Sequence, residues 1–588
     1  MTDTKQSRLT ATLLCVTPPD EHQEQGIRAF LQKKYGEDVA LTIQQDASLK
    51  SGFQLHVGSE VYDWSAKGRM EQFRQQVEQL VAKNTRKDII PLLRSSIDEF
   101  RLLAKSSEVG TVKSIGDGIA VVEGLEHAAY GEILMFDNGI KGMVQDLRRN
   151  ETGCILFDNA DDISAGSKVA RTGKTAGVPV GDAFLGRVVD ALGRPIDGGD
   201  AIPADGYRPV EEPAPGIIDR QSVDTPMETG LLSIDAMFPI GRGQRELIIG
   251  DRQTGKTAIA LDAMLNQKGK NVICVYFAIG QKASSVAQLV ENLRKRDAMD
   301  YCVVVSATAG EADTMQYIAP YAGCAMAEYY MHKGRDVLIV YDDLSKHAIA
   351  YRAMSLLLER APGREAYPGD VFYLHSRLLE RSAHLSDKLG GGSMTALPIV
   401  ETQAGDVSAY IPTNIISITD GQIFLESDLF FAGQRPAVNV GLSVSRVGGA
   451  AQTKATKKAT GSLRLDLAQY REMEVFTQFS SDLDDSTKEQ LHYGQGLMRI
   501  LRQKQYHPLS MHQQVIVLVC AMGHVLSKVA VKDVTDFRDA LLDHFEQEHS
   551  DLCRSLEDEK VLTDDMKQEI LRIAEEYLAA NAERFRKE

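Results

Sequence analysis

The sequence reads Gly250-Asp251-Arg252-Gln253-Thr254-Gly255-Lys256-Thr257 directly after the apolar run Glu246-Leu247-Ile248-Ile249. Every fixed position of the phosphate-binding pattern G-x-x-x-x-G-K-[ST] is filled, with a strand pattern before it and a helical pattern after it. Glycines let backbone N–H groups face phosphates, and the following helix presents its positive N-terminal end to them. The pattern assigns Lys256 to the β- and γ-phosphates and the Thr257 hydroxyl to Mg²⁺. We therefore expect a nucleoside di- or triphosphate site; a glycine turn without a ligand is the alternative.

The residues after this loop predict a parallel sheet. Apolar runs at 271–279, 301–306 and 336–341 alternate with helical patterns, which is typical of a sheet covered by helices on both faces. Ligands of such sheets bind beyond the carboxyl ends of the strands. Asp342 ends the third run, where a carboxylate steadies the magnesium shell. We favour Asp342 over Asp343, whose alternatives are the same role or a hydrogen bond to the next helix.

Hydrophobic spacing and glycine punctuation predict a multidomain chain. The expected parts are a small α+β domain (1–83), an amphipathic connector helix (84–107), a β-barrel (108–176), a P-loop α/β parallel-sheet nucleotide-binding domain (177–450) and a C-terminal helical bundle (451–588). The barrel prediction rests on strand-like runs at 110–115, 118–124, 131–136 and 153–157. A closing helix of the first domain is expected at Met70–Leu80.

Composition excludes several classes of protein. The formal net charge is −16 over 588 residues, which disfavours a nucleic-acid motor, because nucleic-acid binding is driven by clustered Lys and Arg. No signal peptide opens the chain, and no apolar stretch approaches the ~20 residues of a membrane span. We therefore expect any membrane connection to run through partners.

The thiol and imidazole groups predict no metal centre. The seven cysteines are odd in number, lack C-x-x-C spacing and mostly lie inside apolar runs, which predicts buried thiols of a reducing compartment. None of the thirteen histidines is expected to belong to a metal-like constellation.

Four long motifs, in order, resemble the alpha subunit family of F-type ATP synthase, from about residue 86 onward. They lie at 239–257, 341–346, 362–377 and 440–449. The resemblance implies binding of ATP or ADP with Mg²⁺ and alternation with beta subunits in a hexameric ring. It also implies a gamma shaft inside the ring and an indirect link to the membrane sector, at the cytoplasmic face of a bacterial plasma membrane.

Two residues distinguish this family from its catalytic sister, beta. Gln281 stands where beta carries the glutamate that activates the attacking water, and a neutral amide cannot take up a proton; as an alternative, Gln281 only starts a helix. By resemblance, Arg446 is an arginine finger that reaches across an interface into the beta site, a group worth ~10³–10⁵ in turnover. An ordinary ion pair is the alternative role for Arg446.

Further positions carry over by resemblance to the adenine base. Arg435-Pro436 matches the family's pair beside the base, and Gln503 and Gln505 match the glutamines that close over it. A Gln-x-Gln pair on a solvated helix face is the alternative. Gln253 adds a phosphate contact.

The N-terminal residues resemble a second family. The run 46–63, followed by 67–73, is similar to the C-terminal domain of the ATP synthase delta subunit, although Ser51 and Ser59 replace a glycine and an aspartate of that pattern. An unrelated docking domain is the alternative. The resemblance implies attachment to the b subunit of the peripheral stalk.

The expected function is therefore that of a noncatalytic, regulatory subunit of a membrane-associated, ion-driven rotary ATP synthase, coupled to protons or sodium. The alternatives are a self-sufficient hexameric P-loop ATPase of the secretion or Rho type, and a nucleotide-binding scaffold without a catalytic partner. Gln281 and the negative charge disfavour the first alternative, and Arg446 disfavours the second.

Overall fold

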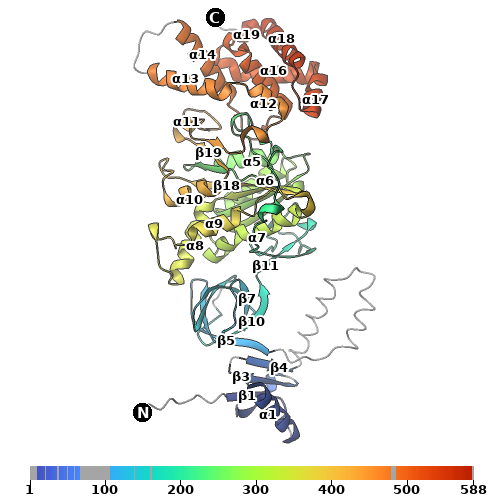
Figure 1. Ribbon diagram of the computed structural model, residues 1–588, viewed down its shortest axis with the longest axis vertical. Coiled ribbons are helices and arrows are strands. Elements are labelled where there is room, and N and C mark those ends of the chain that lie inside the picture. Colours follow the sequence, from blue (N-terminus) through green and yellow to red (C-terminus); the bar gives the residue numbers. More distant parts are fainter. Residues whose placement is uncertain are drawn as a thin grey trace, which may run out of the picture. The chain divides into compact units, whose positions relative to one another are not determined.

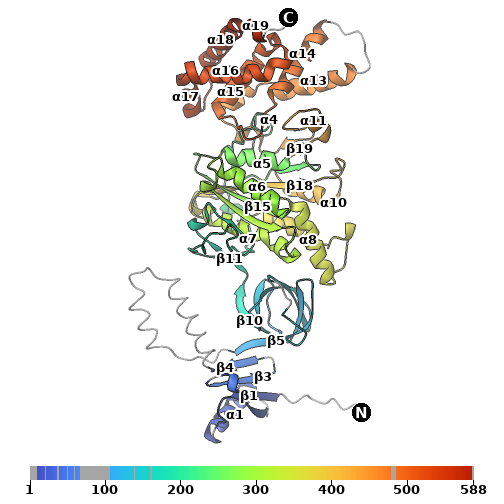
Figure 2. The ribbon, with the colours of Figure 1, turned by 180° about the vertical axis from the view of Figure 1, so that it is seen from behind.

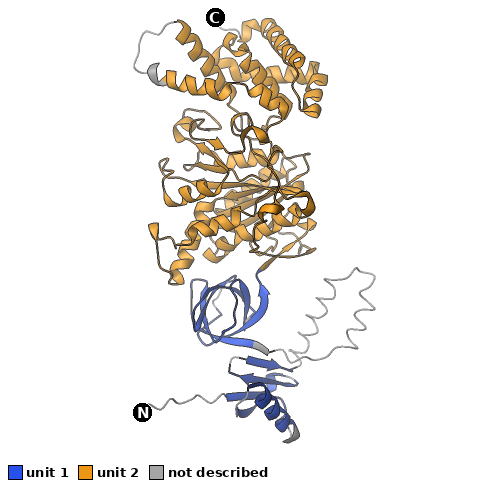
Figure 3. Cartoon of the chain, in the orientation of Figure 1, with its two compact units in different colours: residues 1–176 blue, residues 177–588 orange. Residues whose placement is uncertain are grey.

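The computed structural model describes residues 10–19, 21–35, 39–49, 51–58, 60–65, 106–137, 139–158, 162–477 and 485–585. The chain divides into two compact units, Met1–Ala176 and Gly177–Glu588 (Figure 3). The predicted helix at Met70–Leu80 and residues 84–105 of the predicted connector lie outside the described residues. Within the described part, no helix is long and apolar enough to cross a membrane.

The first unit begins with a small α+β domain, as expected. Its sheet has the order β4-β3-β1-β2, in which β2 runs parallel to β1 and the other pairs are antiparallel. Leu31 of the helix packs on Leu13 and Leu55 of the sheet, and all three are buried. The elements are β1 (Thr10–Cys15), α1 (Glu21–Tyr35), β2 (Ala40–Gln45), β3 (Phe53–Val57) and β4 (Glu60–Asp63).

A closed six-stranded barrel follows, which confirms the predicted barrel. The strands run in the order β5-β6-β9-β8-β7-β10, and β10 pairs back with β5. They are β5 (Ser106–Gly116), β6 (Ile119–Glu123), β7 (Glu132–Phe136), β8 (Lys141–Leu147), β9 (Glu151–Leu156) and β10 (Lys168–Thr175). The strand-like runs missed β8 and β10. Residues 106–107, the end of the predicted connector, are strand, and β5 also pairs with β4.

The second unit is built on an eight-stranded sheet of order β12-β16-β15-β17-β18-β14-β19-β20. Every neighbouring pair is parallel except β19 and β20. The central strands are buried almost throughout because helices cover both faces. The strands are β12 (Val188–Val189), β14 (Leu247–Gly250), β15 (Val272–Gln281), β16 (Cys302–Thr308), β17 (Asp336–Asp342), β18 (Ser393–Glu401), β19 (Gly421–Leu425) and β20 (Val444–Ser445).

The helices α5 and α6 lie on one side of this sheet, and α7 and α8 on the other (Figure 1). Gly323 of α7 allows a close approach, because a Cβ there would lie 1.5 Å from the ring of Phe277 on β15. The main helices are α4 (Leu232–Met237), α5 (Lys256–Leu265), α6 (Ala283–Arg294), α7 (Asp313–Met331), α8 (Leu344–Leu357), α9 (Val371–Leu379), α10 (Tyr410–Ile418) and α11 (Ser427–Phe431).

The remaining elements form the expected helical bundle. Its centre is α15 (Met511–Met522), whose residues 514–521 are all buried and whose first turn is capped by Ser510. Around it lie α12 (Lys454–Thr460), α13 (Leu463–Thr477), α14 (Asp485–Ile500), α16 (Val534–Glu548), α17 (Ser550–Glu559), α18 (Asp564–Ala580) and α19 (Ala582–Phe585), seen from behind in Figure 2. All seven cysteines of the chain are free and buried, as predicted.

Candidate functional site

The phosphate-binding motif forms the turn between β14 and α5. Gly255 adopts φ 97°, a left-handed conformation that favours glycine, and its neighbour Gln253 has φ 61°. Lys256 Nζ donates to the carbonyl oxygens of Gly250, at 2.9 Å, and Asp251. Burial lowers the pKa of Lys256, against the opposing charge of nearby carboxylates. The ammonium thus lies within its own loop, on the carbonyl groups that shape it.

The hydroxyl of Thr257 and the carboxylate of Asp342 meet at the carboxyl edge of the sheet. Thr257 Oγ1 donates to Asp342 Oδ2 at 2.6 Å, and the Tyr276 hydroxyl donates to the same oxygen at 2.6 Å. An alcohol and a carboxylate oxygen at this distance fit the oxygen ligands that Mg²⁺ prefers, with waters completing its shell. Gln281 lies beside them, with Nε2 3.4 Å from the Asp342 carbonyl oxygen.

The neighbouring carboxylate, Asp343, has another task. It is the N-cap of α8, where its Oδ1 accepts from Lys346 N at 2.9 Å, and its Oδ2 lies 3.2 Å from Lys346 Nζ. Only 3% of Asp343 is exposed, and burial raises the pKa of its carboxyl. Of the two alternatives left open by the sequence, Asp342 is the residue in contact with Thr257.

Three other loop residues hold the loop in place. The carboxylate of Asp251 accepts from Thr402 Oγ1 at 2.7 Å and Gly405 N at 2.9 Å, and from Ser427 Oγ at 3.0 Å. Burial opposes its charge, but these hydrogen bonds prevail and lower the pKa of Asp251. Arg252 pairs with Glu401, and the buried Thr254 donates to the Asp251 carbonyl oxygen at 2.9 Å.

The residues expected around adenine lie in two places. The Arg435 guanidinium stacks 4.4 Å above the ring of Phe430, which packs on Gly255; Pro436 follows directly. Gln503 N donates to the Arg435 carbonyl oxygen at 2.8 Å. The side chain of Gln503 is buried and bonded to backbone: Nε2 donates to the carbonyl oxygens of Gly230 and His507, and Oε1 accepts from Leu232 N.

Gln505, by contrast, is exposed and lines a cavity of about 220 Å³ between α5 and α6. Thr257, whose hydroxyl donates to Asp342, and Gln281 line the same cavity. Tyr506 also lines it; its N–H donates to Asp262 at 2.8 Å and its ring lies 3.8 Å from the Arg296 guanidinium. The exposed amide of Gln505 and the hydroxyl of Thr257 therefore line one cavity.

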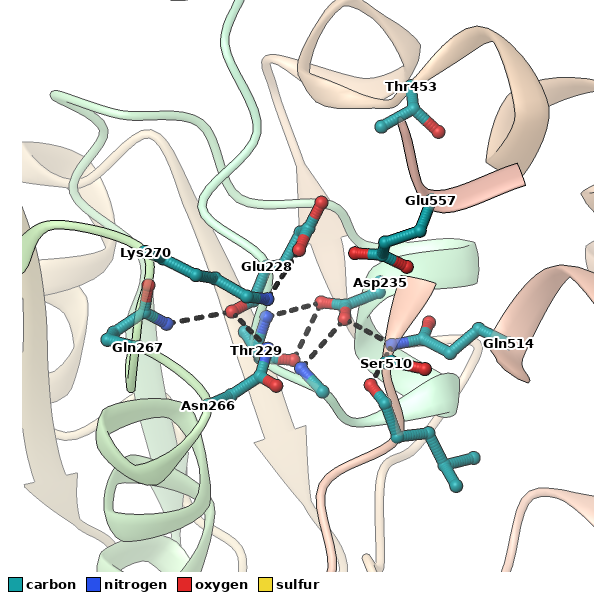
Figure 4. A network of polar contacts seen from close by, with 12 residues as sticks. Glu228, Thr229, Asp235, Asn266, Gln267, Lys270, Thr453, Ser510, Gln514 and Glu557 are labelled. Carbon is teal, nitrogen blue, oxygen red and sulfur yellow. Dashed lines mark hydrogen bonds and ion pairs between the residues drawn. The ribbon is translucent and has the colours of Figure 1, made fainter. Parts of the chain in front are cut away.

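A buried polar network around Asp235 (Figure 4) supports the loop that carries Gln503 and Gln505. Asp235 of α4 accepts from Thr229 N, Thr229 Oγ1 and Gly230 N, and from Gln514 Nε2 of α15 at 2.8 Å. Gly230 in turn accepts from Gln503. Burial raises the pKa of Asp235, and four donated hydrogen bonds satisfy its oxygens. The network ties the helical bundle to the nucleotide-binding segment.

Arg446 is far from this group within the sheet. It follows β20, whose Ser445 pairs with Gly421 at the first residue of β19, and Arg446 N donates to the Asp420 carbonyl oxygen at 2.8 Å. Because β19 is parallel to β14, Arg446 lies at the amino edge and Gly250 at the carboxyl edge. Along the strand direction, the level of Arg446 and the level of Gly250 are five residues apart, which is about 16 Å at a rise of about 3.3 Å per residue. The exposed Arg446 side chain is therefore remote from the chain's own Lys256.

The structure also adds residues that the sequence did not single out. Tyr276 is the one residue of the apolar run 272–279 with a hydroxyl group, and Phe430 precedes Arg435 by five positions; either could have been noticed for those reasons. Asp262 and Asp235 resemble ordinary helix carboxylates in sequence. His512, Glu546 and Cys553, which are far apart in the sequence, come together in space and could hold a metal ion, a grouping that the sequence did not reveal.

Comparisons with known proteins cover nearly the whole chain. Residues 105–173 match the ATP synthase alpha/beta family, beta-barrel domain; residues 230–445 match its nucleotide-binding domain; residues 452–577 match the ATP synthase alpha/beta chain, C terminal domain. Residues 1–77 match a different family, the ATP synthase delta (OSCP) subunit.

Individual relatives agree. The chain is 57% identical over 483 residues to ATP synthase subunit alpha of Clostridium botulinum strain Hall, covering 82% of this chain and 96% of that protein. It is 56% identical over 490 residues to the subunit alpha of Clostridium kluyveri strain NBRC 12016, covering 83% of this chain and 97% of that protein. The chain therefore belongs to the ATP synthase subunit alpha family, with an N-terminal segment of the delta subunit family.

Proposed function

We propose that this chain binds nucleotide without hydrolysing it and supplies Arg446 to the catalytic site of a neighbouring beta subunit. The observation that carries the proposal is the position of Arg446 at the amino edge of the sheet, opposite to Lys256 and Thr257. An exposed arginine there is of no use to the chain's own phosphates. Its planar guanidinium suits phosphate oxygens of another subunit's ligand.

The chain's own site would take ATP or ADP with Mg²⁺. Lys256 would leave the loop carbonyl groups for the β- and γ-phosphates, and the backbone N–H groups of residues 250–257 would cradle them. Thr257 would ligate Mg²⁺ directly and Asp342 through the second shell. The metal would neutralise phosphate charge, while Gln253 would add a phosphate contact.

The noncatalytic character follows from Gln281. Its amide lies beside Asp342, where a general base would have to act on water, and an amide cannot accept the proton. Arg435, Pro436, Gln503 and Gln505 would surround adenine. Gln505 offers a free amide, and Gln503 acts through the backbone that it holds.

The assembly is proposed from family membership. The chain would alternate with beta in a hexameric ring around gamma, on the cytoplasmic face of a bacterial plasma membrane, in an enzyme that makes ATP from ADP and phosphate with a proton or sodium gradient. The delta-family match at residues 1–77 supports a covalent link from this ring to the b subunit of the peripheral stalk.

Magnesium-ATP hydrolysis tests the proposal. The purified chain alone should bind ATP and turn it over poorly or not at all, and addition of its beta partner should give robust hydrolysis. Brisk hydrolysis by the chain alone would instead establish an independent ATPase and refute the role assigned to Gln281.

A further inference from the structure

A group of potential metal ligands lies in the helical bundle, away from the nucleotide site. His512 is in the first turn of α15, Glu546 in the last turn of α16 and Cys553 in the middle of α17, and the three helices pack together (Figure 2). Their ligand atoms all lie within 4.8 Å of one another. The residues are 34 and 41 positions from His512, which is why spacing along the chain gave no sign of them.

We propose that His512 Nε2, Glu546 Oε1 and Cys553 Sγ form a Zn²⁺ site that joins α15, α16 and α17. One imidazole nitrogen, one thiolate and one carboxylate oxygen match the ligands that zinc prefers. His512 Nε2 and Glu546 Oε1 are already 2.7 Å apart, so small side-chain movements admit the metal between them. Three protein ligands leave a fourth tetrahedral position for water, which can enter because 43% of the Glu546 side chain is exposed.

A fourth side chain, Glu557, fixes the ring of His512 in the orientation that the site needs. Its Oε2 lies 2.9 Å from His512 Nδ1 and accepts from His512 N at 3.1 Å. Ligating histidines generally donate their other ring N–H to such an acceptor, which sets the tautomer and leaves the second nitrogen for the metal. With Nδ1–H donated to Glu557, loss of the Nε2 proton that faces Glu546 leaves the Nε2 lone pair for the metal.

The His512 ring and the Cys553 thiol both favour their protonated forms. Burial disfavours a charged His512, but hydrogen bonds to Glu557 and Glu546 outweigh it and raise the pKa of the ring. Burial raises the pKa of the Cys553 thiol to about 11, and Sγ lies 3.6 Å from the Phe545 carbonyl oxygen.

The position of the site gives it a structural consequence. Glu557 lies beside the network around Asp235, together with Lys270 and Thr453 (Figure 4). The hydrogen bond from His512 lowers the pKa of the Glu557 carboxyl, and the charge of Lys270 adds to this. Zinc bound here would fix the start of α15, the helix whose Gln514 holds Asp235. The site thus stabilises the part of the bundle that contacts the nucleotide-binding segment.

Cobalt titration of the full-length, nucleotide-free chain tests the proposal. Co²⁺ takes zinc sites and reports a thiolate ligand through a sulfur-to-metal charge-transfer band. We expect the band to saturate at one Co²⁺ per chain and to disappear on addition of Zn²⁺. Thr257 and Asp342 offer oxygen alone, so the nucleotide site gives no such band.

Variants identify the ligands. Cys553→Ser should abolish the band, and Glu546→Gln, a change at an exposed side chain that leaves the core intact, should weaken affinity at least tenfold. Glu557→Ala should weaken it about 10- to 100-fold. The matched control, Glu548→Gln on the exposed side of the same helix, should bind as wild type. Absence of the band in the wild type, or unchanged affinity in Glu546→Gln, would overturn the proposal.

Discussion

The two edges of the central sheet carry different chemistry. At the carboxyl edge, Lys256, Thr257 and Asp342 converge within hydrogen-bonding distance of the same loop and are largely buried. At the amino edge, Arg446 is exposed directly after the two-residue antiparallel strand β20. On the proposed function, the buried, mutually bonded group would bind a nucleotide of this chain, and the exposed guanidinium would reach a nucleotide of a neighbouring subunit.

Strand direction is what separates them. Seven strands run parallel, so their carboxyl ends bring one set of side chains together. The antiparallel β20 ends at the opposite edge, and Arg446 follows it there. A sheet of this kind can serve two sites at once. In a ring of alternating subunits, each edge would face a different nucleotide.

The largest expected effect is on the hydrolysis rate and comes from changing the shape of the Arg446 side chain at the amino edge. In the complex with beta, Arg446→Lys keeps the charge but loses the planar fork that matches phosphate oxygens, so steady-state hydrolysis should fall by at least ~10²-fold, toward the ~10³-fold or greater loss expected for an arginine finger. ATP binding to this chain's own site should not change. Full activity of Arg446→Lys would show that Arg446 makes only an ordinary ion pair and is not an arginine finger.

A smaller effect is expected from Asp262, which holds Tyr506 N at the carboxyl edge. Burial raises the pKa of Asp262 to about 6, above the ~3.9 of an unfolded chain. The folded state therefore favours the protonated acid: its stabilisation is complete below pH ~4 and is lost as the pH rises through 6. Asp262→Asn cannot ionise and keeps the acceptor for Tyr506, so it should raise the free energy of unfolding at pH 7 by on the order of 2 kcal/mol and change it little at pH 4.

Denaturant midpoints at both pH values measure this difference. Asp297→Asn is the matched control, because Asp297 is exposed and paired only with the exposed Lys268; its effect should stay within about 0.5 kcal/mol. Equal gains at pH 4 and pH 7 would show that ionisation is not the cause.

The smallest expected effect is on ATP binding, and it distinguishes the role of Gln505 from that of Gln503. Gln505→Ala should weaken ATP binding to the chain about threefold to tenfold, the value of one hydrogen bond, without affecting stability. GTP binding should change less, because the amide would read the adenine edge. An unchanged ATP affinity, measured by equilibrium binding, would remove Gln505 from the site.

Gln503→Ala, in contrast to Gln505→Ala, should change the stability of the chain. It leaves the buried Leu232 N unpaired and removes one of the two hydrogen bonds to the Gly230 carbonyl oxygen, so it should lower the free energy of unfolding by about 1–3 kcal/mol. Thermal or chemical unfolding measures it, and an unaltered stability would contradict the structural role of this side chain.

The sequence predicted the features that depend on neighbouring residues, but not those that depend on contacts between residues far apart in the chain. The turn from Gly250 to Lys256 and the strand ending at Asp342 follow from hydrophobic runs and glycine positions, which act over a few residues. The choice between Asp342 and Asp343 needed the direction in which each side chain leaves β17. The burial of Gln503 depends on Gly230, 273 positions away, and the His512 group on three separate helices.

The most direct test of the two-edge account compares Lys256→Ala with Arg446→Ala in the complex assembled with beta. The measurement is nucleotide bound to this chain together with the rate of magnesium-ATP hydrolysis. The account predicts that Lys256→Ala empties this chain's site but keeps hydrolysis within about an order of magnitude, whereas Arg446→Ala keeps the nucleotide and loses ~10³-fold or more in rate. Abolished hydrolysis in Lys256→Ala with normal hydrolysis in Arg446→Ala would contradict it.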